Sequence, residues 1–160
     1  MSGSFDWAKR KIFGGSNADP HSWEELLAFP FIWGLFERKL CDKDANLSTV
    51  RNLRGSVEPF LRSLELENEW LYFRNRYTTE GIVNETFNRL WEREGGKCFV
   101  KCVLEGSSPS NNEKAEALLI IVWRFRNQFY HGVKEFYYPK EQNENYEKVN
   151  KILRLLIDHS

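Results

Sequence analysis

The feature that most constrains the fold is a run of seven apolar residues, Ala117–Trp123, within a helical segment that we place at about residues 113–131. A membrane-spanning helix needs about 20 consecutive apolar residues, so a run of seven indicates a core segment. A helix that is apolar nearly all round has no face suited to water, and other elements must cover it. The sequence therefore predicts one central helix with the rest of the chain packed around it.

The segments that flank this helix carry apolar residues at helical spacing, three and four apart. A first helix is expected to begin at Ser22, which has the spacing of a capping box with Glu25. Pro30 should kink or split that helix, because proline removes one backbone hydrogen bond. No segment reads as a sheet, and the fold class that we predict is all-α, a compact bundle of about five helices.

The remaining helical faces are expected between the first helix and the C-terminus. The Gly95–Gly96 pair should end one of them, and residues 97–104 fit either a helical turn or a short strand. The other expected faces lie at about residues 50–64, 70–77, 83–91 and 146–156.

Length, charge and cysteine count narrow the class of protein. A chain of 160 residues fits one domain, and we expect a flexible N-terminal arm over residues 1–20 and a single domain over residues 21–160. The net charge of zero excludes whole-molecule attraction to nucleic acid or to an anionic membrane as the main driver of binding. Three cysteines are an odd number for a disulfide framework, which favours a cytoplasmic location. We expect no metal site, because Cys98 and Cys102 have only Cys41 to join them.

The end of the central helix breaks the apolar pattern with the string RFRNQFYHG, residues 124–132. Polar groups that emerge from a core helix must find partners, and they often mark function. Asn127 and His131 are four apart and share a helix face, whereas Arg126 lies about 140° from His131 on a straight helix. If the helix ends near Gly132, the imidazole can turn towards Arg126. Histidine exchanges protons near neutral pH, and the arginine fork suits phosphate oxygens.

The residues Arg126 to His131 form an R-x-x-x-x-H motif with a polar residue directly after the arginine. The motif resembles the signature of the HEPN superfamily (higher eukaryotes and prokaryotes nucleotide-binding domains), in which it lies late in a small all-α bundle. Residues 32–37 are similar to the aromatic first-helix segment of these proteins. The resemblance implies a metal-independent endoribonuclease without a cofactor, in which the ribose 2′-hydroxyl attacks the adjacent phosphate at a composite site of a symmetric homodimer. It implies that His131 is the general base or acid, that Arg126 holds the phosphate and that Asn127 orients the histidine or the substrate.

Three residues beside the motif are candidate RNA contacts, namely Arg124, Tyr130 and Lys134. The expected partners are RNA, a second copy of the chain and an antitoxin or regulatory protein, in a prokaryotic toxin–antitoxin or antiviral defence role. Further basic residues could gather into a patch: Arg51, Arg54, Arg62, Arg74 and Arg76. The alternative is a non-catalytic helical interaction or nucleotide-binding module. In that case Arg126 and His131 have a structural role, in a buried ion pair or a helix-end cap that fastens the last helix.

Overall fold

The computed structural model describes residues 3, 4, 7, 11, 23–91, 93–131 and 139–160, and it excludes the side chains of His131 and residues 139–141. The described part is mostly helical, which confirms the all-α prediction, but it contains eight helices where about five were expected. The expected N-terminal arm and its boundary at residue 21 lie almost wholly outside the described residues. The helices are α2 (Glu24–Leu40), α3 (Leu47–Asn52), α4 (Arg54–Arg62), α5 (Glu67–Tyr77), α6 (Glu85–Leu90), α7 (Lys97–Glu105), α8 (Asn111–His131) and α9 (Pro139–Asp158).

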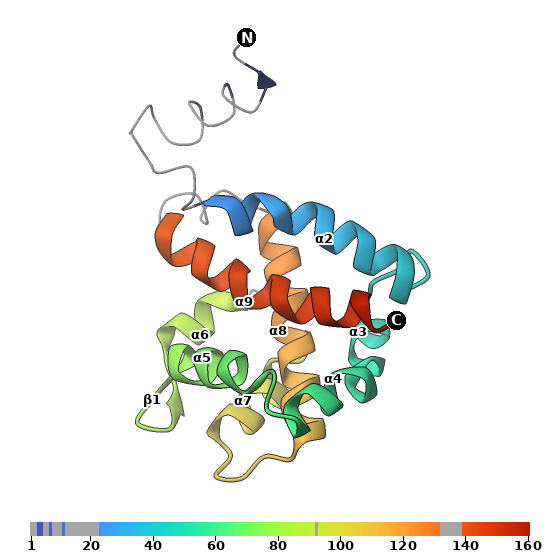
Figure 1. Ribbon diagram of the computed structural model, residues 1–160. Helices are drawn as coiled ribbons and strands as arrows, with labels where there is room; N and C mark the ends of the chain where they lie inside the picture. The colour runs from blue at the N-terminus through green and yellow to red at the C-terminus, as the bar shows by residue number, and fades with distance from the viewer. Residues whose placement is uncertain (1–2, 5–6, 8–10, 12–22, 92, 132–138) are drawn as a thin grey trace.

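Helix α8 is the centre of the molecule, as the apolar run predicted. Every residue from Ala117 to Val122 is fully buried. Helices α3, α4, α6 and α7 all pack against α8, and α9 crosses in front of it in Figure 1. At its start, the Ser110 hydroxyl accepts from the backbone N–H of Glu113 at 3.2 Å, and the Glu113 carboxylate accepts from the N–H of Ser110 at 2.7 Å. This reciprocal pair is a capping box, which fixes where the helix begins.

Helices α2 and α9 lie side by side and form one layer of the bundle, with the C-terminal end of α8 coming up beneath α2 (Figure 1). Helix α2 begins at Glu24, and Ser22 lies outside the described residues. The cap comes from another helix: Oδ1 of Asn143 accepts from the N–H groups of Glu25 and Leu26 at 3.0 and 3.3 Å. Pro30 lies inside α2, which continues to Leu40, so the proline does not split the helix.

The helix expected over residues 50–64 is two helices, because the chain turns at Leu53 between α3 and α4. Gly55 and Pro59 both fall inside α4. Asn46 caps α3, its side-chain oxygen accepting from the N–H of Thr49 at 2.9 Å. The apolar spacing runs through the break, which is why periodicity alone joined the two helices.

A two-stranded antiparallel hairpin, β1 (Thr78–Thr79) and β2 (Ile82–Val83), follows α5 and contradicts the expectation that no segment forms a sheet. Its turn residues Glu80 and Gly81 have φ angles of 52° and 80°. Two central residues with positive φ are the conformation that a tight two-residue hairpin needs. Strands of two residues are too short to produce an alternating pattern, so no local pattern predicted them.

The ambiguous segment at residues 97–104 is helix α7, and the glycine pair precedes it instead of ending α6, which stops at Leu90. Gly96 has a φ of +86°, and a Cβ there would lie 3.0 Å from Cγ2 of Ile120. Only glycine combines this φ with so close an approach at low cost. The pair therefore lets α7 start directly against the middle of α8. Among the described helices, none is both long and apolar enough to cross a membrane.

Candidate functional site at the end of helix α8

The last two turns of α8 present side chains to three different surroundings. Phe125 and Phe129 face Tyr146 of α9, with ring centroids 5.4 and 5.9 Å away, and Phe129 also lies 5.4 Å from Phe29 of α2. Arg124 and Gln128 face α6, while Arg126 and Tyr130 belong to a third face. This division follows from the helical repeat, because residues four apart share a face.

Arg124 is buried, with 8% of its surface exposed. Its Nε donates to the backbone carbonyl of Leu90 at 3.1 Å. Its guanidinium lies 5.3 Å from the ring centroid of Trp91 and 5.8 Å from that of Trp123. Gln128, one turn later, donates to the carbonyl of Arg89 at 3.1 Å. Both side chains therefore join α8 to the end of α6, and this position gives Arg124 no free face for RNA.

Arg126 is half-buried and has a different environment. Its Nη1 donates to Oδ1 of Asn127 at 3.1 Å, and its guanidinium lies 5.1 Å from the ring centroid of Tyr130. Its Nε is buried and has no hydrogen-bond acceptor among the described residues. Tyr130 is 54% exposed, so this face of α8 meets solvent. The structure thus brings together Arg126, Asn127 and Tyr130, three of the six candidate site residues.

His131 is the last residue of α8, which agrees with the expected end of the helix. Its side chain lies outside the described residues, and so do the whole of Lys134 and Gly132. The backbone nevertheless fixes one relation: His131 follows Arg126 by five residues on an unbroken helix. Both residues therefore belong to the C-terminal end of α8, where the unpaired carbonyls give the helix a partial negative charge that favours cations.

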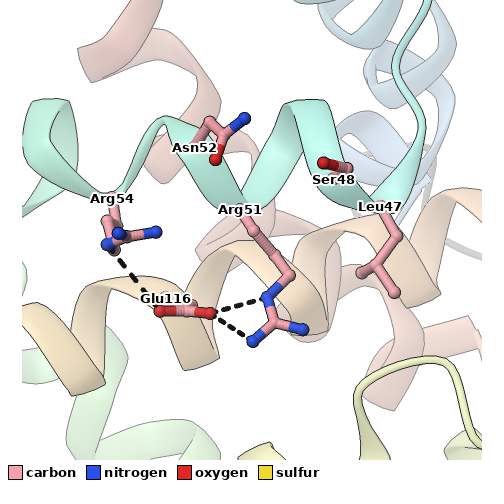
Figure 2. A pocket seen from close by; sticks show the side chains of 6 residues that line it. All are labelled: Leu47, Ser48, Arg51, Asn52, Arg54 and Glu116. Atoms are coloured by element: carbon pink, nitrogen blue, oxygen red, sulfur yellow. Dashed lines mark hydrogen bonds and ion pairs between the residues drawn. The ribbon is translucent and has the colours of Figure 1, made fainter.

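Four of the five further basic residues are tied to acceptors outside the motif. Arg51 Nε donates to Oε1 of Glu116 at 2.6 Å, and Arg54 Nε lies 3.9 Å from Oε2 of the same carboxylate. Figure 2 shows both arginines reaching Glu116 at a pocket of about 440 Å³, which Leu47 and Ser48 also line. Glu116 precedes Arg126 by ten residues, or about 15 Å along the helix. This cluster was not predicted, because the two arginines are more than sixty residues from their partner.

Two other arginines of the expected patch are also locally bound. Arg62 Nη2 lies 3.6 Å from Oε2 of Glu58 within α4, and Arg74 Nη2 donates to the carbonyl of Gly106 at 2.9 Å. The exposed basic surface is therefore dispersed over several helices. Arg126 is the arginine of the motif itself, and the exposed Arg89 lies close to it, because its backbone carbonyl accepts from Gln128.

The cysteines lie apart from this end of α8. Cys98 and Cys102 are exposed on α7, and Cys41 is buried at the end of α2. Burial, with the nearby charges of Glu37 and Asp44, raises the pKa of the Cys41 thiol to about 11. Within the described residues, no three His, Cys, Asp or Glu side chains are grouped so as to hold a metal ion.

Comparison of the chain with protein-family models, with curated proteins and with solved structures finds no match.

Proposed function

We propose that the protein is a metal-independent endoribonuclease of HEPN type. The observation that carries the proposal is the environment of Arg126, which a neighbouring amide and a tyrosine ring hold at a solvent-exposed helix end. His131 follows about 1.4 turns later on the same helix. An arginine with spare donors beside a histidine suits a phosphodiester, because the guanidinium stabilises charge that develops on phosphate oxygens.

The reaction is an intramolecular transesterification, in which phosphorus exchanges its bond to the 5′-oxygen for a bond to the 2′-oxygen. The ribose 2′-oxygen attacks phosphorus, the bond from phosphorus to the 5′-oxygen breaks, and a 2′,3′-cyclic phosphate and a free 5′-hydroxyl result. In our proposal His131 removes the 2′-proton or protonates the leaving 5′-oxygen, and Arg126 binds the phosphate. Asn127 orients the histidine or the substrate, and it also accepts a hydrogen bond from Arg126. One histidine supplies one of the two proton transfers. A symmetric homodimer, in which two motifs share a cleft, supplies the second.

The cellular role that we propose follows from the same resemblance. An RNA-cutting activity needs restraint, and we propose a prokaryotic toxin–antitoxin or antiviral defence system with an antitoxin or regulatory protein as a partner. The cysteine count supports a cytoplasmic site of action. Zero net charge supports a protein that holds a few phosphates at one place over one that coats RNA.

The test is cleavage of a mixed-sequence single-stranded RNA by the purified protein in excess chelator. We expect wild-type protein to produce 2′,3′-cyclic phosphate ends, and a substrate with 2′-deoxyribose throughout to stay intact. Arg126→Ala and His131→Ala should each lower the rate by about 10²–10³, the usual effect of losing a charge-stabilising donor or a proton-transfer group. Arg62→Ala is the matched control, because it removes one exposed arginine from α4 and should leave the rate unchanged.

The result that would overturn the proposal is an inert wild-type protein, or variants that cut as well as wild type. Thermal unfolding of each variant separates loss of chemistry from loss of fold. If His131→Ala lowers the unfolding temperature and the wild type leaves RNA intact, the motif fastens the last helix, and the protein is an interaction or nucleotide-binding module instead.

A further inference from the structure

The outer face of α2 carries large apolar side chains in contact with water. Phe31 is 78% exposed and Leu35 is 54% exposed, although both belong to a helix whose other face is deep in the core. Soluble proteins scatter single exposed apolar residues, but two large ones a single turn apart on one helix face form a patch that suits contact with another element. We call this face of the helix the α2 stripe, in which Leu27 and Ala28 are half-buried and the other members are exposed: Glu24, Leu27, Ala28, Phe31, Gly34, Leu35 and Arg38.

The stripe is narrow and lies directly opposite the buried face. At about 100° per residue, its seven members fall within about 120° of the helix circumference, centred on Phe31. The buried residues Leu26, Phe29, Trp33 and Phe36 centre on the other side, about 180° away. Helix α9 fixes α2 from its inner side, where Nδ2 of Asn150 donates to the backbone carbonyl of Glu25 at 2.8 Å. The stripe is therefore held outward on a helix that cannot turn to bury it.

The order of residues along the stripe is the same in both directions about Phe31. Leu27 and Leu35 each lie four residues from it, and Ala28 and Gly34 each lie three residues from it. The ends are complementary in charge, since Glu24 lies seven residues before Phe31 and Arg38 seven residues after it. Within the described part of the chain, neither Glu24 nor Arg38 forms an ion pair.

We infer that the α2 stripe binds the α2 stripe of a second copy of this chain, antiparallel, about a two-fold axis at Phe31. That arrangement sets Leu27 against the second copy's Leu35, and Glu24 against the second copy's Arg38, twice by symmetry. The small residues Ala28 and Gly34 then face each other beside the central phenylalanines. A Cβ at Gly34 would meet nothing within 4 Å, so the backbone there is open to close approach at the 8–10 Å typical of packed helices.

Charge complementarity selects the second copy over other occupants. A parallel pairing would set Glu24 against Glu24 and Arg38 against Arg38, which is repulsive at both ends. The antiparallel pairing makes both ends attractive and keeps every apolar side chain of the stripe opposite another. The inference identifies a contact between two copies that is separate from the shared cleft of the proposed ribonuclease, because the stripe lies on the side of α2 opposite Phe29, against which Phe129 of α8 packs. It therefore does not rest on the proposed activity.

The experiment measures the mass of the full chain by sedimentation velocity across a range of concentrations, without RNA. We expect a dimer, and we expect Phe31→Asp to weaken it by more than about 100-fold by burying two carboxylates at the axis. Leu71→Asp is the matched control, because Leu71 is 41% exposed on α5, away from the stripe, and should leave the dimer intact.

Two charge reversals test the register. Glu24→Arg and Arg38→Glu should each weaken self-association by about ten-fold, since each turns two attractive pairs into two repulsive ones. Mixing the two variants should restore the wild-type affinity as a heterodimer, because position 24 of each chain again meets an opposite charge at position 38 of the other. The double variant should also dimerise.

Three results would overturn the inference: a wild-type chain that is monomeric throughout, a dimer insensitive to Phe31→Asp, or a mixture no tighter than its single variants. A monomer would leave the stripe to residues 1–22 or to a different protein. The outcome is independent of the cleavage assay, since a dimer that leaves RNA intact upholds the interface and contradicts only the ribonuclease proposal.

Discussion

The middle and the C-terminal end of α8 are one continuous helix, yet their surroundings determine them in different ways. In the middle, Ala117 to Val122 are fully buried and carry no polar side chain. At the end, single hydrogen bonds determine each position: Arg124 to a carbonyl of α6, and Arg126 to its neighbour Asn127. Close packing of apolar side chains determines the structure of the middle. At the end, the position of each polar side chain is determined by the acceptor that its donor can reach.

The comparison teaches that two arginines in one short string can have opposite roles. Arg124 uses its donors and its flat face inside the protein, between Trp91 and Trp123. Arg126, two residues on, points to a face that ends in the exposed ring of Tyr130. A helix rotates about 200° between them, and this rotation alone separates a packing residue from a candidate phosphate-binding residue.

The largest effect that we expect comes from the middle of α8. Leu119→Ala should lower the free energy of unfolding by about 2–5 kcal/mol, because it removes buried methyl groups and leaves a cavity in a fully covered site. Urea denaturation measures the loss, and Leu71→Ala on the exposed side of α5 should cost far less. A loss at Leu119 as small as that at Leu71 would show that the middle of α8 is not covered on all sides.

The next largest effect that we expect is a difference in stability loss between substitutions of the two arginines. Arg124→Ala should cost about 2 kcal/mol, because it removes a charged donor from the Leu90 carbonyl and the packing between two indole rings. Arg126→Ala should cost about 0.5 kcal/mol, as expected of a half-exposed side chain whose one described hydrogen bond is to its neighbour. The same urea titration measures both. Equal losses at the two positions would mean that Arg126 is structural, and the contrast between them would disappear.

The central helix could be predicted from the sequence because its signal is local. The expected range of residues 113–131 differs from α8 by two residues at one end, since the apolar run and its polar flanks lie on the same segment. The last helix was recognisable for the same reason. The fold class followed from these faces, but the number of helices did not, because the turn at Leu53 leaves the apolar spacing unchanged.

Features that depend on distant partners were beyond the sequence. Asn143 caps α2 from more than a hundred residues away, and no local pattern marks it as a cap. The different surroundings of Arg124 and Arg126 depend on where α6 ends, which the sequence placed at the glycine pair instead of Leu90. The candidate site was found by its residue types, and its division into a packing part and an exposed part required the fold.

The start of α8 offers a third region for comparison, because a capping box between Ser110 and Glu113 stabilises it locally. The Ser110 backbone N–H donates to the Glu113 carboxylate, and the Ser110 hydroxyl accepts from the Glu113 backbone N–H. The bond from the Ser110 backbone N–H is the main reason that the pKa of Glu113 lies below its ordinary value of 4.5. A carboxylate in the first turn also meets the positive end of the helix dipole. This end should therefore depend on pH, whereas the middle of the same helix should not.

The smallest effect that we expect is on the pH dependence of stability at the start of α8. Glu113→Gln isolates this effect, because glutamine keeps the hydrogen bond to Ser110 and loses only the charge. A carboxyl group whose pKa is lower in the folded state contributes stability above its unfolded pKa and loses it as the pH falls through the folded value. The unfolding temperature of wild type should thus exceed that of Glu113→Gln near neutral pH, and the two should converge in acid. Ser110→Ala should remove only part of the difference, because it takes away the hydroxyl contact but keeps the backbone N–H that lowers the pKa of Glu113 the most. Leu119→Ala should lower the unfolding temperature by the same amount at every pH.

The contradicting result is a difference in unfolding temperature between wild type and Glu113→Gln that is the same at every pH. The effect of the substitution would then lie in packing, and the start of α8 would resemble its middle instead of its polar end.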